Sequence, residues 1–150
     1  MKRATMSEAA LQRHVVKLLQ AFGHPDVCFW HCPNGELRHR SVGAKLKLAG
    51  VRAGVADLNF VIDGRFHALE LKTETGALSE AQYLFGEDIE RAGGFYHVAR
   101  GLDQALGVLR AIGAFRANTP AFLVSSVADG DGVRERPRKG RRLSGAASTP

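Results

Sequence analysis

The sequence has no apolar run that approaches the roughly 20 residues of a membrane-spanning helix, and this absence excludes a transmembrane segment. Its first residues contain no apolar segment of the signal-peptide type, so we expect a cytoplasmic protein. Hydrophobic residues make up 45% of the 150 positions, as is typical of a globular protein. A chain of this length is sufficient to bury a core in one domain.

Cysteine is scarce, with only 2 residues in the chain. Cys28 and Cys32 flank His31 in the segment Cys-Phe-Trp-His-Cys. A zinc site would need a fourth ligand, for which His24 and His39 are the nearest candidates, and the spacing matches no common zinc finger. The cysteines alternate with other residues as on a strand, so we expect reduced, partly buried thiols and keep zinc as the alternative.

Acidic residues are the rarer charged class, with 15 Asp and Glu against 21 Lys and Arg and a net charge of +6. This basic excess is compatible with nucleic acid binding. About half of it lies in residues 129–150, where the composition changes to Gly, Arg, Pro and Ser. Residues 129–150 are therefore predicted to form a basic, disordered tail, with accessory contact to a nucleic acid backbone as the alternative role.

Apolar periodicity and turn residues predict the order helix, strand, helix, hairpin, helix, strand, helix. The predicted helices cover residues 6–22, 42–49, 79–92 and 102–112, and the predicted strands cover 27–32, 55–62, 65–72 and 95–99. The third helix can connect its flanking strands as a parallel crossover. We predict an α/β fold with a mixed β-sheet flanked by helices on both faces, as a single domain in residues 1–120, and a possible edge strand at 121–128.

The most informative segment is the predicted hairpin. Asp63-Gly64 between two apolar runs is the strongest short-range signal for a two-residue type I′ turn. Residues equidistant from that turn pair across the strands, which places Asp57 opposite Glu70 on one face. Lys72 lies two residues beyond Glu70 and therefore on the same face, because side chains alternate along a strand.

Two carboxylates held face to face repel each other unless they share a proton or a cation. Mg²⁺ prefers oxygen ligands, usually one or two carboxylates with water and substrate phosphate completing its shell. Asp57 and Glu70, together with Lys72, are therefore predicted to form a site for Mg²⁺ or Mn²⁺ and a phosphate. The alternative is a salt-bridge cluster in which Lys72 alone supplies the counter-charge.

Two more polar side chains have a double interpretation. Thr5-Met6-Ser7-Glu8 matches a capping box, yet the spacing of Glu8 from the apolar positions of its helix places it on the inward face. Ser79-Glu80-Ala81-Gln82 is also a capping box, at a helix that begins close to the proposed site. Glu8 is predicted equally as a cap and as a metal-site residue, and Gln82 as a residue that supports the site.

Cations and an amide side chain gather just before the acid pair in the sequence, at Asn34, Arg38, Arg40, Lys45, Lys47 and Arg52. Solvated surface charge is the ordinary interpretation for any one of them. As a group, these residues are predicted to contact phosphates, which would position a DNA duplex without reading its sequence.

Asp57 followed by Glu70-Leu71-Lys72 resembles the PD-(D/E)XK nuclease motif, and the wider run resembles the VRR-NUC (virus-type replication-repair nuclease) family. The likeness covers roughly residues 7–115, and its pieces are, in order, His31-Cys32-Pro33-Asn34-Gly35, Gly43-Ala44-Lys45-Leu46-Lys47, Gly50-Val51-Arg52-Ala53-Gly54-Val55-Ala56-Asp57, Glu70-Leu71-Lys72 and Leu78-Ser79-Glu80-Ala81-Gln82. One departure is Ala56, where the family usually has proline. Proline there would only stiffen the approach to Asp57.

The resemblance implies a restriction-endonuclease-like fold and a DNA endonuclease that uses Mg²⁺ or Mn²⁺ and no organic cofactor. Asp57, Glu70 and the backbone carbonyl of Leu71 would bind the metal. In the same comparison, Glu8 would help to bind a metal or a hydrated metal, Lys72 would orient or activate the attacking water, and Gln82 would support the site.

Small stand-alone members of that family suggest a homodimer that cuts branched DNA, such as a Holliday junction, in a bacterial or phage-infected host cell. Two other functions remain open. One is a DNA-binding module that keeps the fold without cutting, which loss of Asp57, Glu70 or Lys72 would have favoured. The other is a sequence-specific restriction-type nuclease, which calls for a larger recognition surface than 150 residues easily provide.

Overall fold

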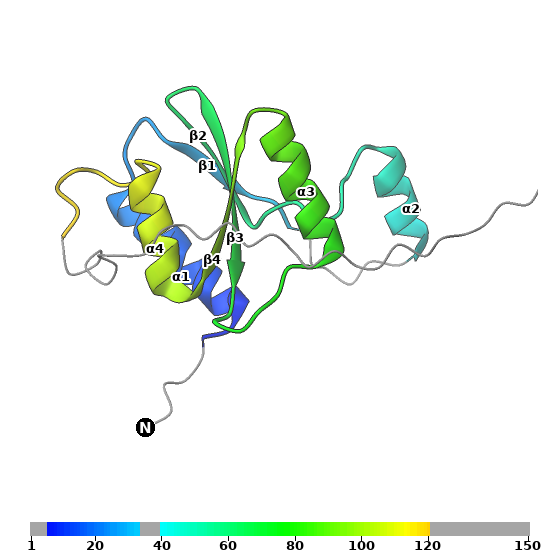
Figure 1. Cartoon of the computed structure of the whole chain (residues 1–150), viewed down its shortest axis with the longest axis horizontal. Helices are drawn as coiled ribbons and strands as arrows, with labels where there is room; N and C mark the ends of the chain where they lie inside the picture. Colours follow the sequence, from blue (N-terminus) through cyan, green and yellow to red (C-terminus); the bar gives the residue numbers. More distant parts are fainter. Residues whose placement is uncertain (1–5, 34–39, 121–150) are drawn as a thin grey trace, which may run out of the picture.

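A mixed four-stranded sheet forms the centre of the computed structural model, which describes residues 6–33 and 40–120 (Figure 1). Its strands lie in the order β1 (Cys28–His31), β2 (Leu58–Ile62), β3 (Arg65–Lys72) and β4 (Phe95–Arg100). β1 pairs with β2 and β2 with β3 in antiparallel fashion, whereas β4 is parallel to β3. The predicted mixed sheet is therefore confirmed, whereas the predicted edge strand at 121–128 and the tail at 129–150 lie outside the described residues.

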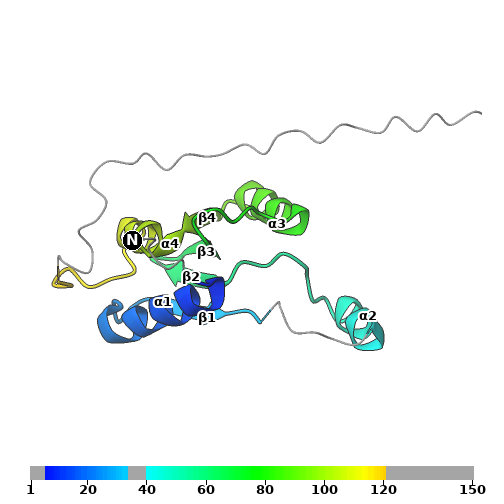
Figure 2. The same cartoon turned by 90° about the horizontal axis from the view of Figure 1, so that it is seen from below.

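Helices cover both faces of the sheet (Figures 1 and 2). One face carries α1 (Glu8–Phe22) and α4 (Gly101–Ala111), and the other carries α3 (Glu80–Arg91), while α2 (Arg40–Leu48) stands apart from the sheet in both views. The predicted order of elements is confirmed, with boundaries that differ by a few residues. Within residues 6–33 and 40–120, no helix is long and apolar enough to cross a membrane.

The hairpin of β2 and β3 has the predicted turn and register. Asp63 and Gly64 have φ values of 50° and 73°, both positive as a type I′ turn requires. Leu58 pairs with Leu69 at the far end of the hairpin. The predicted start of β2 at residue 55 is wrong, because the Leu71 N–H donates to the carboxylate of Asp57 (2.8 Å) and strand pairing stops at Leu58.

Two apolar layers fix the sheet between its helices. The larger layer joins the sheet to α1 and α4 and includes Leu69 and Leu71 of β3. The smaller layer lies under α3 and includes Ala68 of β3 and Phe85 of α3. Since side chains alternate along a strand, Glu70 faces the α3 side of the sheet, together with Ala68. The sheet therefore directs its buried acid toward α3.

The start of α1 differs from the sequence prediction. Its N-cap is Ser7, whose hydroxyl accepts the backbone N–H of Ala10 at 3.3 Å, so the predicted capping box that begins at Thr5 is wrong. Serine is itself a favoured N-cap residue, and its use makes Glu8 the first residue of the helix. Glu8 is then not the capping partner three residues into the helix, and its carboxylate is available for another contact.

Both cysteines carry free thiols. Cys32 is partly buried as predicted, whereas Cys28 is exposed, so the prediction of burial is wrong for Cys28. The reason is the alternation of side chains along β1, which directs Phe29 toward the core and its neighbour Cys28 away from it.

Candidate active site

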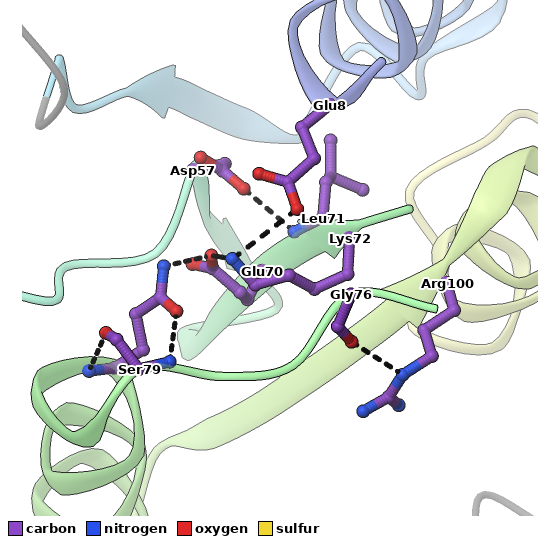
Figure 3. A network of polar contacts seen from close by, with 9 residues as sticks. Glu8, Asp57, Glu70, Leu71, Lys72, Gly76, Ser79 and Arg100 are labelled. Atoms are coloured by element: carbon purple, nitrogen blue, oxygen red, sulfur yellow. Dashed lines mark hydrogen bonds and ion pairs between the residues drawn. The ribbon is translucent and has the colours of Figure 1, made fainter. Parts of the chain in front are cut away.

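The acid pair lies at the end of the β2–β3 hairpin remote from its turn (Figure 3). Asp57 immediately precedes β2, and its carboxylate is held by the backbone N–H of Leu71. Glu70 precedes Leu71 on β3 and is only 1% exposed. The structure thus brings the two predicted carboxylates to one place, on either side of the last paired residues of the hairpin.

Lys72 links the acid pair to α1. Its Nζ atom lies 3.0 Å from Glu70 Oε1 and 3.7 Å from Glu8 Oε1, and the residue is 7% exposed. The ammonium group therefore lies between a carboxylate of the sheet and a carboxylate at the start of α1 (Figure 3). Because this group is almost fully buried, its pairing with Glu70 is much less screened than a surface ion pair.

The two ends of the Gln82 side-chain amide make different contacts: one completes the predicted cap of α3, and the other reaches Glu70. Its Oε1 accepts the N–H of Ser79 at 2.9 Å while the Ser79 hydroxyl accepts the N–H of Gln82, which completes the capping box of α3. Its Nε2 donates to Glu70 Oε1 at 2.5 Å. The first turn of α3 is therefore fastened directly to the buried acid.

The loop before Asp57 packs backbone to backbone against the same turn of α3. Gly54 has a φ of 77°, and a Cβ atom at this position would lie 2.2 Å from the Ala81 carbonyl oxygen and 2.6 Å from the Gln82 nitrogen. Only glycine permits both this conformation and this approach. The close contact sets the relative positions of the segments that carry Asp57 and Gln82.

Arg52 adds a second contact between this loop and α3. Its guanidinium pairs with Asp88, which also pairs with Arg91, and lies 5.3 Å from the centre of the Phe85 ring. These contacts give Arg52 a structural role that the sequence did not suggest. Its predicted contact with DNA remains a prediction.

Burial changes the protonation of the acid pair. Removal from water, followed by the charge of Asp57, raises the pKa of Glu70 from 4.5 to about 7, against the opposing effect of Lys72. Burial also raises the pKa of Asp57, and the hydrogen bond from Leu71 opposes that rise. The pair therefore favours an added proton or an added cation near neutral pH.

The polar atoms around Glu70 fit a hard divalent cation. Glu70 Oε1 is occupied by Gln82 and Lys72, whereas the buried Oε2 has no hydrogen-bond partner among the described residues. The carboxylates of Asp57 and Glu70 and the carbonyl of Leu71 are all oxygen donors, which suit Mg²⁺ or Mn²⁺. A cation would give the unpaired oxygen of Glu70 the partner that a buried charge needs.

The described part of the chain holds no group of three or more His, Cys, Asp or Glu side chains that could bind a metal ion by themselves. Lys72 lies between Glu8 and Glu70, so a role of Glu8 as a ligand remains a prediction. Mg²⁺ commonly takes only one or two protein carboxylates and completes its shell with water and phosphate. A site with the two carboxylates of Asp57 and Glu70 agrees with that coordination.

Of the predicted DNA-contacting residues, the structure describes the side chains of Lys45, Lys47 and Arg52 only. Lys45 and Lys47 are exposed on α2, which stands apart from the sheet. Arg40 begins α2, but its side chain is outside the described part, and Asn34 and Arg38 lie wholly outside the described residues. Their contact with DNA stays a prediction.

Two polar residues hold the backbone that leads to Asp57, and the sequence predictions missed both. A ring nitrogen of His31 lies 2.7 Å from the Asp57 carbonyl oxygen and donates to it, and the buried Asn59 amide donates to the Ala56 carbonyl at 3.4 Å. Asparagine is depleted in strands, so Asn59 within the apolar run of β2 was a usable signal. His31 therefore contacts the backbone of Asp57. Among the described residues, it belongs to no group of three or more side chains that could bind a metal ion.

The raised pKa of Glu70 predicts a pH-dependent stability for the protein in EDTA. Below about pH 4.5 both the folded and the unfolded protein hold the proton, and the full stability is present. As the pH rises to about 7, the unfolded chain releases that proton first, and we expect the free energy of unfolding to fall by on the order of 3 kcal/mol. Urea unfolding over this pH range measures the loss.

Glu70→Gln should flatten this profile because it removes the titrating group. The matched control is Glu80→Gln, at the exposed first residue of α3, which should keep the wild-type dependence. A wild-type stability that stays constant or rises between these pH values would contradict the assigned burial of Glu70.

Comparison with known proteins supports the fold. No family model matches the chain, and no curated protein matches it. A solved structure described as a VRR_NUC domain protein superposes with a TM-score of 0.61 and 23% sequence identity, covering 87% of this chain and 98% of that chain. The protein therefore has a VRR-NUC-like fold, which confirms the predicted resemblance and the restriction-endonuclease-like fold class.

Proposed function

We propose that this protein is an endodeoxyribonuclease that depends on Mg²⁺ or Mn²⁺ and hydrolyses phosphodiester bonds. The observation that carries the proposal is the buried Glu70 beside the partly buried Asp57, with Lys72 3.0 Å from Glu70, at the end of a hairpin in a VRR-NUC-like fold. Holding the partly buried Asp57 close to the buried Glu70 is unfavourable unless a cation or proton compensates their charge. A metal site for phosphate-ester hydrolysis would account for this arrangement of charges.

Asp57, Glu70 and the carbonyl of Leu71 would hold the cation. When bound, a divalent cation lowers the pKa of water and offsets charge on a phosphate. Gln82 and Leu71 hold the two carboxylates in place through their N–H groups. The Lys72 ammonium, fixed by Glu70 and Glu8, orients the attacking water and adds positive charge near the scissile phosphate.

DNA would be held mainly by its phosphates. The chain carries a net charge of +6, and Lys45 and Lys47 project from α2 into solvent. Lysine contacts of this kind position a duplex and carry no sequence information. We include Asn34, Arg38, Arg40 and Arg52 in the same proposed surface.

The preferred substrate in this proposal is branched DNA such as a Holliday junction, cut by a homodimer. A two-fold dimer presents the same cleft twice, which suits the near-symmetric arms of a four-way junction. The extended position of α2, away from the sheet, supports contact with a DNA arm beyond the one at the acid pair (Figure 2).

Cleavage of matched linear duplex, flap and four-way-junction DNA tests this function. We expect cutting with Mg²⁺ or Mn²⁺, none with EDTA, and about tenfold or greater preference for the junction, equal to 1.4 kcal/mol or more. Denaturing gels measure the rates, and size-exclusion chromatography with light scattering measures the mass.

Each failure has a separate meaning. Equal cutting of all three substrates would remove the structure-selective claim and, if it occurs at a fixed sequence, favour a restriction-type nuclease. Tight binding without cutting in either metal would favour a DNA-binding module that retains the nuclease fold. A monomer in the presence of the junction would contradict the dimer.

A further inference from the structure

Tyr96 lies in β4 beneath α3, and its ring is fixed by close packing. A Cβ atom on Gly86 of α3 would lie 2.6 Å from Cδ1 of Tyr96. The helix can therefore pack this close to the ring only because residue 86 is glycine. Phe85 of the same helix meets the ring edge-on, with centroids 6.1 Å apart at 71°. The ring therefore has little freedom to move its hydroxyl to another place.

The hydroxyl at the end of this ring is buried and has no hydrogen-bond partner among the described residues. A buried, unpaired hydroxyl destabilises a fold, and phenylalanine would fill the same space without that cost. Packing alone therefore explains the ring of Tyr96 but leaves its oxygen unexplained. A partner in the working enzyme would explain it.

Glu70 is the candidate partner by position. In the parallel pairing of β3 with β4, Tyr96 is opposite Ala68, and Glu70 is opposite Val98. Tyr96 and Glu70 are thus diagonal neighbours on the α3 side of the sheet, with the small apolar side chain of Ala68 beside them. Glu70 Oε2 is also buried and without a hydrogen-bond partner in the described part of the chain.

The electrostatics agree with this placement. Burial, and after it the negative charges of Glu70 and Asp57, raise the pKa of the Tyr96 hydroxyl above its usual value. The hydroxyl therefore keeps its proton at neutral pH and can act as a donor. Its sensitivity to the charges of both acids places it within the field of the pair.

We propose that Tyr96 is a positioning residue for the acid pair: once a cation occupies the site, its hydroxyl donates a hydrogen bond to Glu70 Oε2, directly or through one buried water. A carboxylate oxygen has two lone pairs, so Oε2 can accept this bond and still face a cation. Hydrogen bonds to a metal-binding carboxylate fix its orientation and strengthen metal binding. This inference rests on the proposed function, because it assigns Tyr96 to the same site.

Tyr96→Phe tests the hydroxyl without disturbing the ring. The other tyrosine of the chain, Tyr83, supplies the matched control, since its hydroxyl donates to Glu87 on the exposed side of α3 at 2.6 Å. Isothermal titration of the full chain with Mn²⁺ should show about tenfold weaker binding for Tyr96→Phe and wild-type binding for Tyr83→Phe. Thermal unfolding without metal should give Tyr96→Phe an equal or higher midpoint than wild type.

Wild-type Mn²⁺ affinity and junction cleavage in Tyr96→Phe, with a raised midpoint, would show that Tyr96 only fills the core and would overturn the inference. A lowered midpoint would also count against it, because it would reveal a partner that the hydroxyl holds in the metal-free fold. If the wild-type protein itself neither binds Mn²⁺ nor cuts DNA, the proposed function fails, and this inference fails with it. Equal behaviour of an active wild type and Tyr96→Phe removes the Tyr96 role alone.

Discussion

Replacement of Asp57 by asparagine is expected to lower the rate of DNA cleavage by about 10³-fold while DNA binding stays near the wild-type level. The asparagine oxygen can still accept the Leu71 N–H that now bonds to Asp57, so the loop should keep its position. What is lost is the charge that would hold the cation. Metal-assisted stabilisation of several kcal/mol, at 1.36 kcal/mol per tenfold, corresponds to a rate effect of this size. Single-turnover cleavage and fluorescence anisotropy with junction DNA measure the two quantities.

Asp63→Asn is the matched control for this change. Asp63 lies in the turn at the opposite end of the same hairpin with a φ of 50°, a conformation that asparagine also adopts readily. Like Asp57→Asn, the Asp63→Asn substitution removes one negative charge, but it should leave the rate of cleavage unchanged. Cleavage by Asp57→Asn within a few-fold of wild type would refute the assignment of Asp57 to the site.

Gly54→Ala is expected to reduce the free energy of unfolding by about 2–4 kcal/mol, through backbone strain and overpacking together. The added Cβ would lie 2.2 Å from the carbonyl oxygen of Ala81, which is backbone and cannot rotate away. Either the loop or the first turn of α3 must move, and Gln82 would then lose its geometry toward Glu70. Urea unfolding measures the stability, and cleavage should fall with it.

Gly50→Ala separates the clash from the conformational strain. Gly50 has a φ of 88°, and a Cβ there would meet nothing within 4 Å. Its cost should be confined to the positive φ, about 1–2 kcal/mol. Equal destabilisation by both substitutions would mean that the close packing of Gly54 against α3 does not contribute to the stability of the protein.

Local sequence rules were sufficient for the hairpin and for the capping box of α3. A two-residue turn fixes the register of its strands, and alternation then fixes the face of every side chain. The pairing of Leu58 with Leu69 follows from Asp63-Gly64 alone, and it brings Asp57 near Glu70. The capping box of α3 is likewise a local signal, since it depends on residues 79 and 82 only.

Other features depend on contacts between distant segments, which spacing does not reveal. The bond from His31 to the Asp57 carbonyl joins β1 to the acid loop, and the packing of Tyr96 against Gly86 joins β4 to α3. The start of α1 was misplaced because two neighbouring hydroxyl residues can both serve as a cap, and only the structure shows that Ser7 does. The position of α2 away from the sheet could not be predicted either, because the spacing of its apolar residues indicates a helix but not where the helix lies.

The side-chain amide of Gln82 joins the N-terminus of α3 to the carboxylate of Glu70. Fraying of this helix end would therefore also misalign the carboxylate. If the opening turn of α3 unwinds, the donor to Glu70 leaves with it. The population of proteins able to react is then limited by a local opening equilibrium at this helix terminus, which can lie well below the global unfolding free energy.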